Sequence, residues 1–582
     1  MRAKAEAPPA LTQSSTTLPP GPPSWRDVGW PAALVVAVVA TLYADVLRIP
    51  FVNDDFVFLD RVRGAGFAAL WSNVRTPFNW YRPWSRELHY WTLQHAFGSN
   101  SPAYHVVSLV LLVLVVAAYA YLVSRLAGRG AARFAACGWL VMSAWAIPVL
   151  WIAGVQELWL LLFACVFLAL VLRRAPPWAS ALAYALALLS KETAATLPVI
   201  AAAFGLGVLD WRPREAWRQL GLLVVVTLAW AAIHPLIGGR LFSGAPASLA
   251  TAHAMAPLAI ATKTVASVVN LEGFARIDLR SPGTWAAGGA LALLVGALIW
   301  IPAWREKSAD VGPRLSRGTH AAVLVWCVAG WAPVLMPGIE WHAYYGLLGS
   351  AGAWVLLSLW IDAPLARIAI VALMSVLCAF QNLAPSTDWG TAYYLRRAAL
   401  FLTHAERDLK AQLPTAPGGS RLYFVRVPYY VGFLTSGAPA LRTWYDDSSI
   451  SGGFWSDYRR RESVQPGRDY FFRFDSSAAF VPVIAGPESL PAALAGNPRW
   501  TRDHEALAAA FAQADDWDAA GGEYEKLLRV DPGNADYLFG GGLAALGVGD
   551  TTRAAALIAA AGRAPNASSE IRTAAERFAR MR

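Results

Sequence analysis

The chain has 582 residues, of which 56% are hydrophobic and only 15% are charged. Soluble chains average about 25% charged residues, so this composition excludes an ordinary soluble protein and indicates a polytopic membrane protein with room for a soluble domain. The net charge is +10. Much of this excess lies in short loops between apolar segments, where it reports membrane topology, so we expect no nucleic-acid partner.

Residues 1–27 are rich in Pro, Ser, Thr and Ala, a composition that cannot bury a core and that predicts a disordered tail. Residues 28–381 predict a mostly α-helical transmembrane domain of about eleven spans, because each apolar segment is long enough, or nearly so, to cross a core of about 30 Å. The predicted spans are about 30–47, 104–124, 134–152, 157–172, 177–190, 193–210, 218–236, 284–303, 319–336, 343–361 and 365–381.

Arginines and lysines gather in alternate loops of this domain, as at Arg125 to Arg133 and at Arg212 to Arg218. Positively charged loops stay in the cytoplasm, so the other loops are extracytoplasmic. We therefore expect a multi-pass protein of the inner or plasma membrane with a cytoplasmic N-terminus. With eleven spans, the residues from about 382 onward lie on the extracytoplasmic (periplasmic) side.

The first external loop, residues 48–103, contains a segment from Ser85 to Phe97 in which polar and aromatic residues alternate. This pattern predicts an amphipathic helix lying on the membrane surface.

The C-terminal region divides into two parts. Residues 382–495 predict a small α/β module, with a helix at Tyr393 to Leu413 and strands at Leu422 to Val427 and Tyr470 to Phe474. Residues 496–582 predict paired helices like tetratricopeptide (TPR) repeats, because Pro532 and Pro565 recur 33 residues apart in similar turns. The alternative is a generic helical hairpin. A repeat of this kind would offer a surface for a protein partner.

Two adjacent acids, Asp54 and Asp55, follow the first predicted span. Ionisable residues at the membrane surface indicate a functional site, although a solvated pair that caps the next helix is the simpler alternative. Other external loops add polar residues at the same face: Arg82, Gln156, Glu157, Lys191, Glu192, Arg240, Glu340 and His342. Acids there could accept a proton from a hydroxyl, and cations could hold a phosphate leaving group. Individually, these residues could also be helix caps or interfacial side chains.

Four stretches resemble motifs of the integral-membrane glycosyltransferases of the C-type fold (GT-C), within the protein O-mannosyltransferase superfamily and closest to its TPR-containing branch and bacterial relatives. The stretches are Asn53-Asp54-Asp55-Phe56, Tyr81-Arg82-Pro83, Trp151 to Leu158, and Leu188 to Thr193, and Glu340 to Ser350 is a looser match. The likeness covers about residues 30–380. The chain departs from the pattern at Val155, where the family usually has Arg, and at Ser108, where it often has Asn.

The resemblance implies a mannosyltransferase-like enzyme with a polyprenyl-phosphate sugar donor in the lipid bilayer. The sugar would pass with inversion to a hydroxyl of a protein, lipid or glycan acceptor outside. Asp54 is the expected general base and Asp55 the second candidate. The expected donor-phosphate ligands are Arg82, Lys191 and His342, with Glu192 orienting Lys191. The expected substrate or orienting residues are Tyr81, Glu157, Glu192 and Glu340. A divalent metal, Mg²⁺ or Mn²⁺, at Asp54 and Asp55 is left open, since hard oxygen ligands suit these ions.

Two other functions fit parts of the sequence. A transporter or flippase for a lipid-linked sugar would use the same cations without a catalytic acid, but the inverted internal symmetry common in transporters is not visible. A non-catalytic scaffold for envelope assembly would use the tail helices for docking and the bundle as an anchor.

Overall fold

The computed structural model describes residues 25–74, 76–237, 255–273, 278–305, 316–335, 341–386, 388–427, 437–462, 467–474, 480–483 and 498–581. Nearly all of the predicted N-terminal tail lies outside these ranges, and its residues 25–27 instead begin helix α1 (Trp25–Leu42). Glu340 and Arg240, both predicted site residues, also lie outside the described residues.

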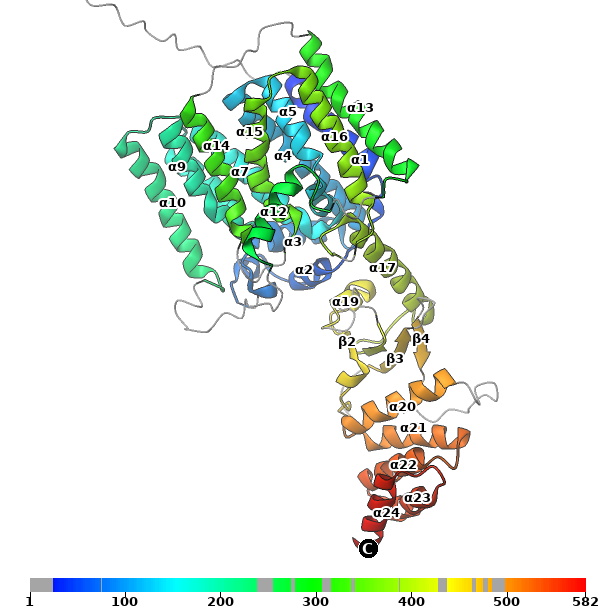
Figure 1. Cartoon of the computed structure of the whole chain (residues 1–582). Helices are drawn as coiled ribbons and strands as arrows, with labels where there is room; N and C mark the ends of the chain where they lie inside the picture. Colours follow the sequence, from blue (N-terminus) through cyan, green and yellow to red (C-terminus); the bar gives the residue numbers. More distant parts are fainter. Residues whose placement is uncertain are drawn as a thin grey trace, which may run out of the picture.

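Six helical segments of the described chain are long and apolar enough to cross a membrane. They correspond to α4 (Ser101–Ala127), α7 (Val155–Leu172), α10 (Pro213–Ile233), α13 (Pro282–Arg305), α14 (Arg317–Trp331) and α16 (Pro364–Leu383). A bent pair, α5 (Arg129–Leu140) and the segment Ser143–Leu150 that contains α6 (Ala146–Leu150), would make a seventh span. The chain is thus built as a multi-pass membrane protein (Figure 1).

The predicted count of about eleven spans is not confirmed. Helices do occupy the other predicted positions, as α1, α8 (Pro177–Leu188), α9 (Leu197–Gly207) and α15 (Leu347–Trp360). None of them meets the length and apolarity of the six segments above, and a helix of twelve residues such as α8 covers only about 18 Å at 1.5 Å per residue.

Small residues let neighbouring helices of the bundle approach closely. A Cβ atom on Gly330 of α14 would lie 2.6 Å from the Gly349 Cα atom of α15, so the two backbones are nearly in contact. Across the bundle, the Tyr119 hydroxyl of α4 donates to the Ala351 carbonyl of α15 at 2.7 Å. These contacts fix the core helices whose ends carry the polar residues described below.

A small α/β unit follows α17 (Ala392–Gln412). Its sheet has the order β2-β1-β3-β4, with β1 parallel to β2 and β3, and β3 antiparallel to β4. The strands are β1 (Arg421–Val425), β2 (Ser451–Phe454), β3 (Asp469–Phe474) and β4 (Phe480–Val483), and helix α19 (Pro439–Tyr445) lies between β1 and β2 in the chain. The strand-like run predicted at 470–474 lies within β3, and the run predicted at 422–427 overlaps β1, which ends at Val425.

Five helices form the C-terminal part: α20 (Pro498–Gln513), α21 (Trp517–Val530), α22 (Ala535–Gly547), α23 (Thr551–Arg563) and α24 (Ser569–Met581). They join the sheet through aromatic packing of Phe471 on Phe511, with ring centroids 5.3 Å apart, and through the Tyr458 hydroxyl, which donates to Asp516 at 2.6 Å. Figure 1 shows the chain running from the bundle through the α/β unit to these helices. The TPR assignment stays a prediction.

Residues 48–103, the predicted first external loop, are folded against the α/β unit. Its helix α2 (Asp54–Val62) contacts α19 through Arg442, whose Nε and Nη2 atoms each lie 2.6 Å from an Asp60 oxygen. A second ion pair joins Arg63 to Asp446 at 2.6 Å, and the Phe56 and Trp444 rings meet edge to face. Helix α2, which begins with Asp54, is therefore held by the α/β unit.

The helix predicted for Ser85 to Phe97 exists, as the π-helical turn η4 (Pro83–Leu88) and α3 (His89–Phe97). Arg86 and Glu87 in its first half are buried, at 2% and 3% exposure, and its position on the membrane surface stays a prediction. Arg86 donates to Glu87 and to the carbonyl oxygens of Pro77 and Trp80. The charged residues of this turn therefore face the protein interior.

Candidate active site

Asp55 is a buried acceptor that ties two loops together. Its Oδ2 atom accepts the Val52 N–H at 2.8 Å, and its Oδ1 atom accepts the Tyr90 hydroxyl at 2.7 Å and the Ala153 N–H at 2.8 Å. Burial raises the Asp55 pKa to about 7, although these hydrogen bonds to the ionised form oppose the rise. Both carboxylate oxygens are occupied, so Asp55 is suited to positioning and not to exchanging a proton with a substrate.

Asp54 has different surroundings. It is the first residue of α2 and follows Asn53, whose φ of 52° turns the chain into the helix. Its half-buried carboxylate makes no hydrogen bond or ion pair with another described residue. Burial raises the Asp54 pKa to about 6, while the positive charges of Arg82 and Arg86 lower it. Asp54 can therefore take up a proton close to neutral pH.

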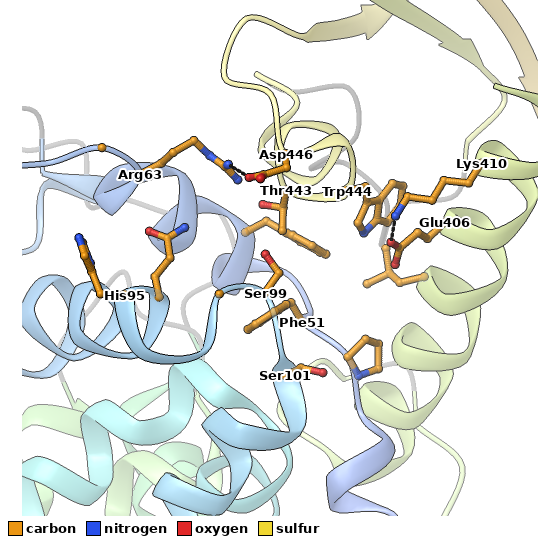
Figure 2. A pocket seen from close by; sticks show the side chains of 16 residues that line it. Phe51, Arg63, His95, Ser99, Ser101, Glu406, Lys410, Thr443, Trp444 and Asp446 are labelled. Carbon is orange, nitrogen blue, oxygen red and sulfur yellow. Dashed lines mark hydrogen bonds and ion pairs between the residues drawn. The ribbon is translucent and has the colours of Figure 1, made fainter. Parts of the chain in front are cut away.

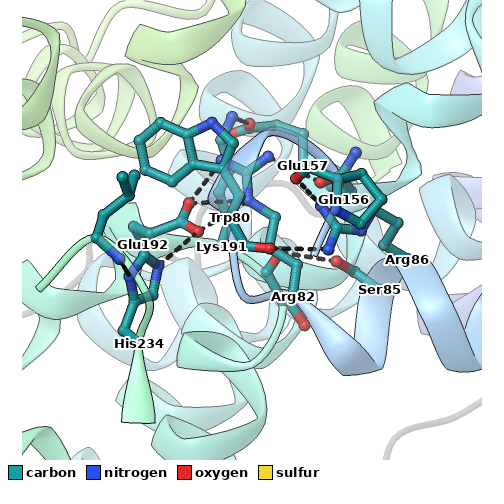
Figure 3. A network of polar contacts seen from close by, with 12 residues as sticks. Trp80, Arg82, Ser85, Arg86, Gln156, Glu157, Lys191, Glu192 and His234 are labelled. Atoms are coloured by element: carbon teal, nitrogen blue, oxygen red, sulfur yellow. Dashed lines mark hydrogen bonds and ion pairs between the residues drawn. The ribbon is translucent and has the colours of Figure 1, made fainter. Parts of the chain in front are cut away.

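Arg82 lies at the centre of a polar network (Figure 3). Its Nε and Nη2 atoms contact the Glu192 carboxylate at 2.8 and 2.6 Å, and its Nη1 atom donates to the Gln156 amide oxygen at 2.8 Å. Glu192 also lies 3.3 Å from the buried His234. A guanidinium has five N–H donors, so two remain for a ligand once these three contacts with described residues are made.

Lys191 forms a second, separate pair. Its ammonium contacts the Glu157 carboxylate, and both side chains are buried. The rings of Tyr344 and Tyr345 lie 5.1 and 4.8 Å from Lys191 Nζ, within the range of a cation–π interaction. Burial lowers the Lys191 pKa, and the charge of Glu157 opposes this change.

The predicted pairing of Glu192 with Lys191 is not observed. Glu192 contacts Arg82, and Lys191 contacts Glu157. Lys191 has an extended backbone, with φ −163° and ψ 142°. In an extended chain, successive side chains point to opposite sides, which separates the two neighbours.

His342 contacts the segment that precedes α17. Its Nδ1 atom is 3.1 Å from Asp388 Oδ1, and its ring lies 3.8 Å from the Trp389 ring. The Tyr344 ring contacts both His342 and Lys191, so His342 is one aromatic ring removed from the Lys191 pair. The buried Tyr81, predicted to orient the substrate, donates its hydroxyl to the Trp71 carbonyl at 3.0 Å.

The acids around Asp54 outnumber the cations. Arg82, Arg86 and Lys191 all contact carboxylates of this cluster. The five carboxyl groups are Asp54, Asp55, Glu87, Glu157 and Glu192. Arg82 and Lys191 are each paired with a carboxylate, so an anionic ligand would share them with Glu192 and Glu157 through the N–H groups that these acids leave open.

The donor set at the acidic pair does not favour a metal ion. Within the described ranges, no group of three or more His, Cys, Asp or Glu side chains is arranged to hold one. Both Asp55 oxygens already accept hydrogen bonds, which leaves Asp54 as the one open ligand of the pair. The pair alone thus falls short of the several oxygen ligands that Mg²⁺ requires.

Three further residues, Tyr90, Glu87 and His234, contact the site from different segments and are not predicted from the sequence. The signals of Tyr90 and Glu87 are weak because aromatic and polar residues alternate throughout residues 48–103, and His234 is a single histidine at the end of α10. Tyr344 and Tyr345 both face Lys191.

Comparison with known proteins found no matching family model and no matching curated protein. Among solved structures, the chain is similar to a crystal structure of ArnT from Cupriavidus metallidurans bound to undecaprenyl phosphate. The identity is 13%, the match covers 77% of this chain and 94% of that chain, and the TM-score is 0.40. The apo state of the same protein matches at 14% identity over 72% and 85% of the two chains, with a TM-score of 0.34. At these TM-scores the likeness assigns neither a family nor an activity to this chain.

Proposed function

We propose that this protein is a membrane glycosyltransferase of the GT-C type. It would move a sugar from a polyprenyl-phosphate donor to an acceptor hydroxyl on the extracytoplasmic side, with inversion. The observation that carries the proposal is the state of the two acids: Asp55 is fully engaged, whereas Asp54 is open and has its pKa raised to about 6. An open carboxylate beside an arginine supplies a base and an anion ligand in one site.

The chemistry needs one base and one stabilised leaving group. The acceptor oxygen attacks the anomeric carbon while its proton passes to Asp54. The bond between this carbon and the phosphate oxygen breaks on the opposite face, and polyprenyl phosphate leaves with its negative charge. The remaining N–H groups of Arg82, which Glu192 and Gln156 hold in place, would bind the phosphate oxygens.

The other predicted residues take supporting roles in this proposal. The Lys191–Glu157 pair would contribute its field and shape, and His342 would support the Tyr344 and Tyr345 rings that face Lys191. The motif resemblance favours a mannosyltransferase-like donor, and a TPR-like tail would bind a protein partner. Both remain proposals, as does the placement of the C-terminal part outside the cytoplasm.

The test is release of labelled sugar from a panel of polyprenyl-phosphate sugars, undecaprenyl carriers included, by the purified full-length protein in lipid. Wild type is compared with Asp54→Asn and Asp55→Asn, with and without chelator. The proposal expects transfer or slow hydrolysis that Asp54→Asn lowers by about 10²-fold or more and that chelation does not change. Movement of the donor across the bilayer without cleavage would instead identify a flippase, and binding without either event would identify a scaffold.

A further inference from the structure

A cavity of about 780 Å³ lies where the first external loop meets the α/β unit (Figure 2). Phe51 and Phe56 line it from the loop around α2, and Ser99 and Ser101 line it from the turn between α3 and α4. Helices α17 and α19 close the other side, where Trp444 faces the cavity. Its volume is in the range of small-molecule sites, about 300–1,000 Å³.

This cavity is separate from the Asp54 centre. Neither Asp54 nor Arg82 nor Lys191 is among the residues that line it. It nevertheless shares helix α2 with that centre, because Asp54 begins the helix and Phe56 faces the cavity. A ligand here would contact the helix that carries the proposed base without blocking that base.

The charged side chains of the cavity neutralise one another. Arg63 contacts Asp446 at 2.6 Å, and Lys410 contacts Glu406 at 2.8 Å (Figure 2). Two cations and two carboxylates thus leave the lining without net charge, and the Nε and Nη2 atoms of Arg63 have no hydrogen-bond partner among the described residues, so they can donate to a ligand oxygen. Paired charges of this kind favour a ligand without net charge.

Neutral hydrogen-bonding groups complete the lining. The side chains of Gln94, Ser99 and Ser101 make no hydrogen bond with another described residue. They line the cavity together with the aromatic residues Phe51 and Trp444. Open amide and hydroxyl groups beside aromatic rings match the hydroxyls and the apolar C–H faces of a sugar ring.

We propose that this cavity binds a neutral carbohydrate, as a site distinct from the Asp54 centre. Its use as an anchor for a glycan-bearing acceptor rests on the proposed function, whereas the binding itself does not. The bound sugar would hydrogen-bond to Gln94, Ser99 and Ser101 and pack against the rings of Phe51 and Trp444.

The test is saturation-transfer NMR on the full-length protein in lipid nanodiscs, with a library of neutral oligosaccharides and, as comparison probes, anionic oligosaccharides and neutral peptides. Ser99→Trp fills the cavity, and Gln94→Ala with Ser101→Ala removes its open hydrogen-bonding groups. Ser451→Trp is the matched control, because Ser451 is an exposed residue of β2 outside the cavity.

We expect at least one neutral oligosaccharide to bind, and both cavity variants to weaken it about tenfold or more. Ser451→Trp and Asp54→Asn should leave this binding unchanged. The proposal is overturned if no neutral oligosaccharide binds, if Ser99→Trp has no effect, or if only peptides or anionic sugars bind. Sugar binding without donor cleavage would refute the proposed function and leave this site intact, so the two failures are distinguishable.

Discussion

Asp54 and Asp55 are neighbours in the chain with different hydrogen bonding. The Asp55 carboxylate accepts three hydrogen bonds, from Val52, Tyr90 and Ala153, whereas the Asp54 carboxylate accepts none from another described residue. Asp55 is thus anchored to the loop before α7 and fixes the position of its neighbour Asp54. This relationship divides the pair into a reactive group and a positioning group.

Asp55→Asn should destabilise the protein. The new amide keeps one acceptor oxygen and turns an NH₂ group toward donors such as the Ala153 N–H, which leaves buried polar groups unsatisfied. We expect a loss of about 1–3 kcal/mol, seen as a lower thermal unfolding midpoint in lipid. Asp54→Asn is the control and should leave the midpoint unchanged at neutral pH or raise it. An equal midpoint for wild type and Asp55→Asn would contradict the anchoring role.

Turnover should depend on the ionisation of Asp54. A general base must be deprotonated, and the Asp54 pKa is raised to about 6. The rate of donor cleavage should therefore fall by about tenfold per pH unit below pH 6 and level off above it. A flat profile between pH 5 and 7 would argue against Asp54 as the base.

The raised Asp54 pKa also makes stability depend on pH, and stability should fall with rising pH where turnover rises. Because the folded-state pKa lies above that of the unfolded chain, folding favours the protonated form. The resulting stabilisation is present below about pH 4 and is lost as the pH rises through 6. Wild type should thus lose stability relative to Asp54→Asn between pH 4 and 7, which thermal unfolding in lipid at several pH values measures.

The buried Lys191–Glu157 pair allows a structural role to be separated from a role in binding. Lys191→Met alone leaves Glu157 buried without its cation, which should cost about 3–5 kcal/mol of stability. The double variant Lys191→Met with Glu157→Leu should recover most of that stability, because an apolar pair can replace a buried ion pair. We predict that donor binding by the double variant recovers only in part, which would show that Lys191 contributes to binding. Full recovery of binding together with stability would show that Lys191 is structural.

The contact between α2 and α19 should influence activity at a distance. Arg442→Ala removes the two-point ion pair with Asp60 and loosens the helix that carries Asp54. Arg421→Ala removes a pair of similar geometry and burial, with Asp469, inside the α/β unit. Both variants should lose about 1 kcal/mol of stability or less.

Only Arg442→Ala should lower turnover, several-fold, and the charge exchange Arg442→Asp with Asp60→Arg should restore part of it. Equal turnover in Arg442→Ala and Arg421→Ala would show that α19 does not position α2.

The sequence predicts the helical bundle and the α/β strands well, because long apolar runs and alternating strands are local signals. It also predicts where the polar cluster lies, since Asp54, Arg82 and Lys191 all follow or precede apolar segments. It could not separate Asp54 from Asp55, because the donors to Asp55 come from Tyr90 and Ala153, which only the fold brings together.

The sequence also could not predict which acid of the cluster pairs with which cation. Glu192 was expected beside its neighbour Lys191, but the extended backbone turns it toward Arg82, 110 positions away in the chain. The number of complete spans and the burial of Arg86 depend on packing between segments. No periodicity within one segment reports such packing.

The most direct test of the central claim measures donor binding and donor cleavage together, in one preparation of full-length protein in lipid. We predict that Asp54→Asn binds the polyprenyl-phosphate sugar as wild type does. Its rate of cleavage should be lower by a factor of at least about 10². Cleavage by Asp54→Asn at the wild-type rate would contradict the account, because the sugar would then leave without the base that the open carboxylate supplies.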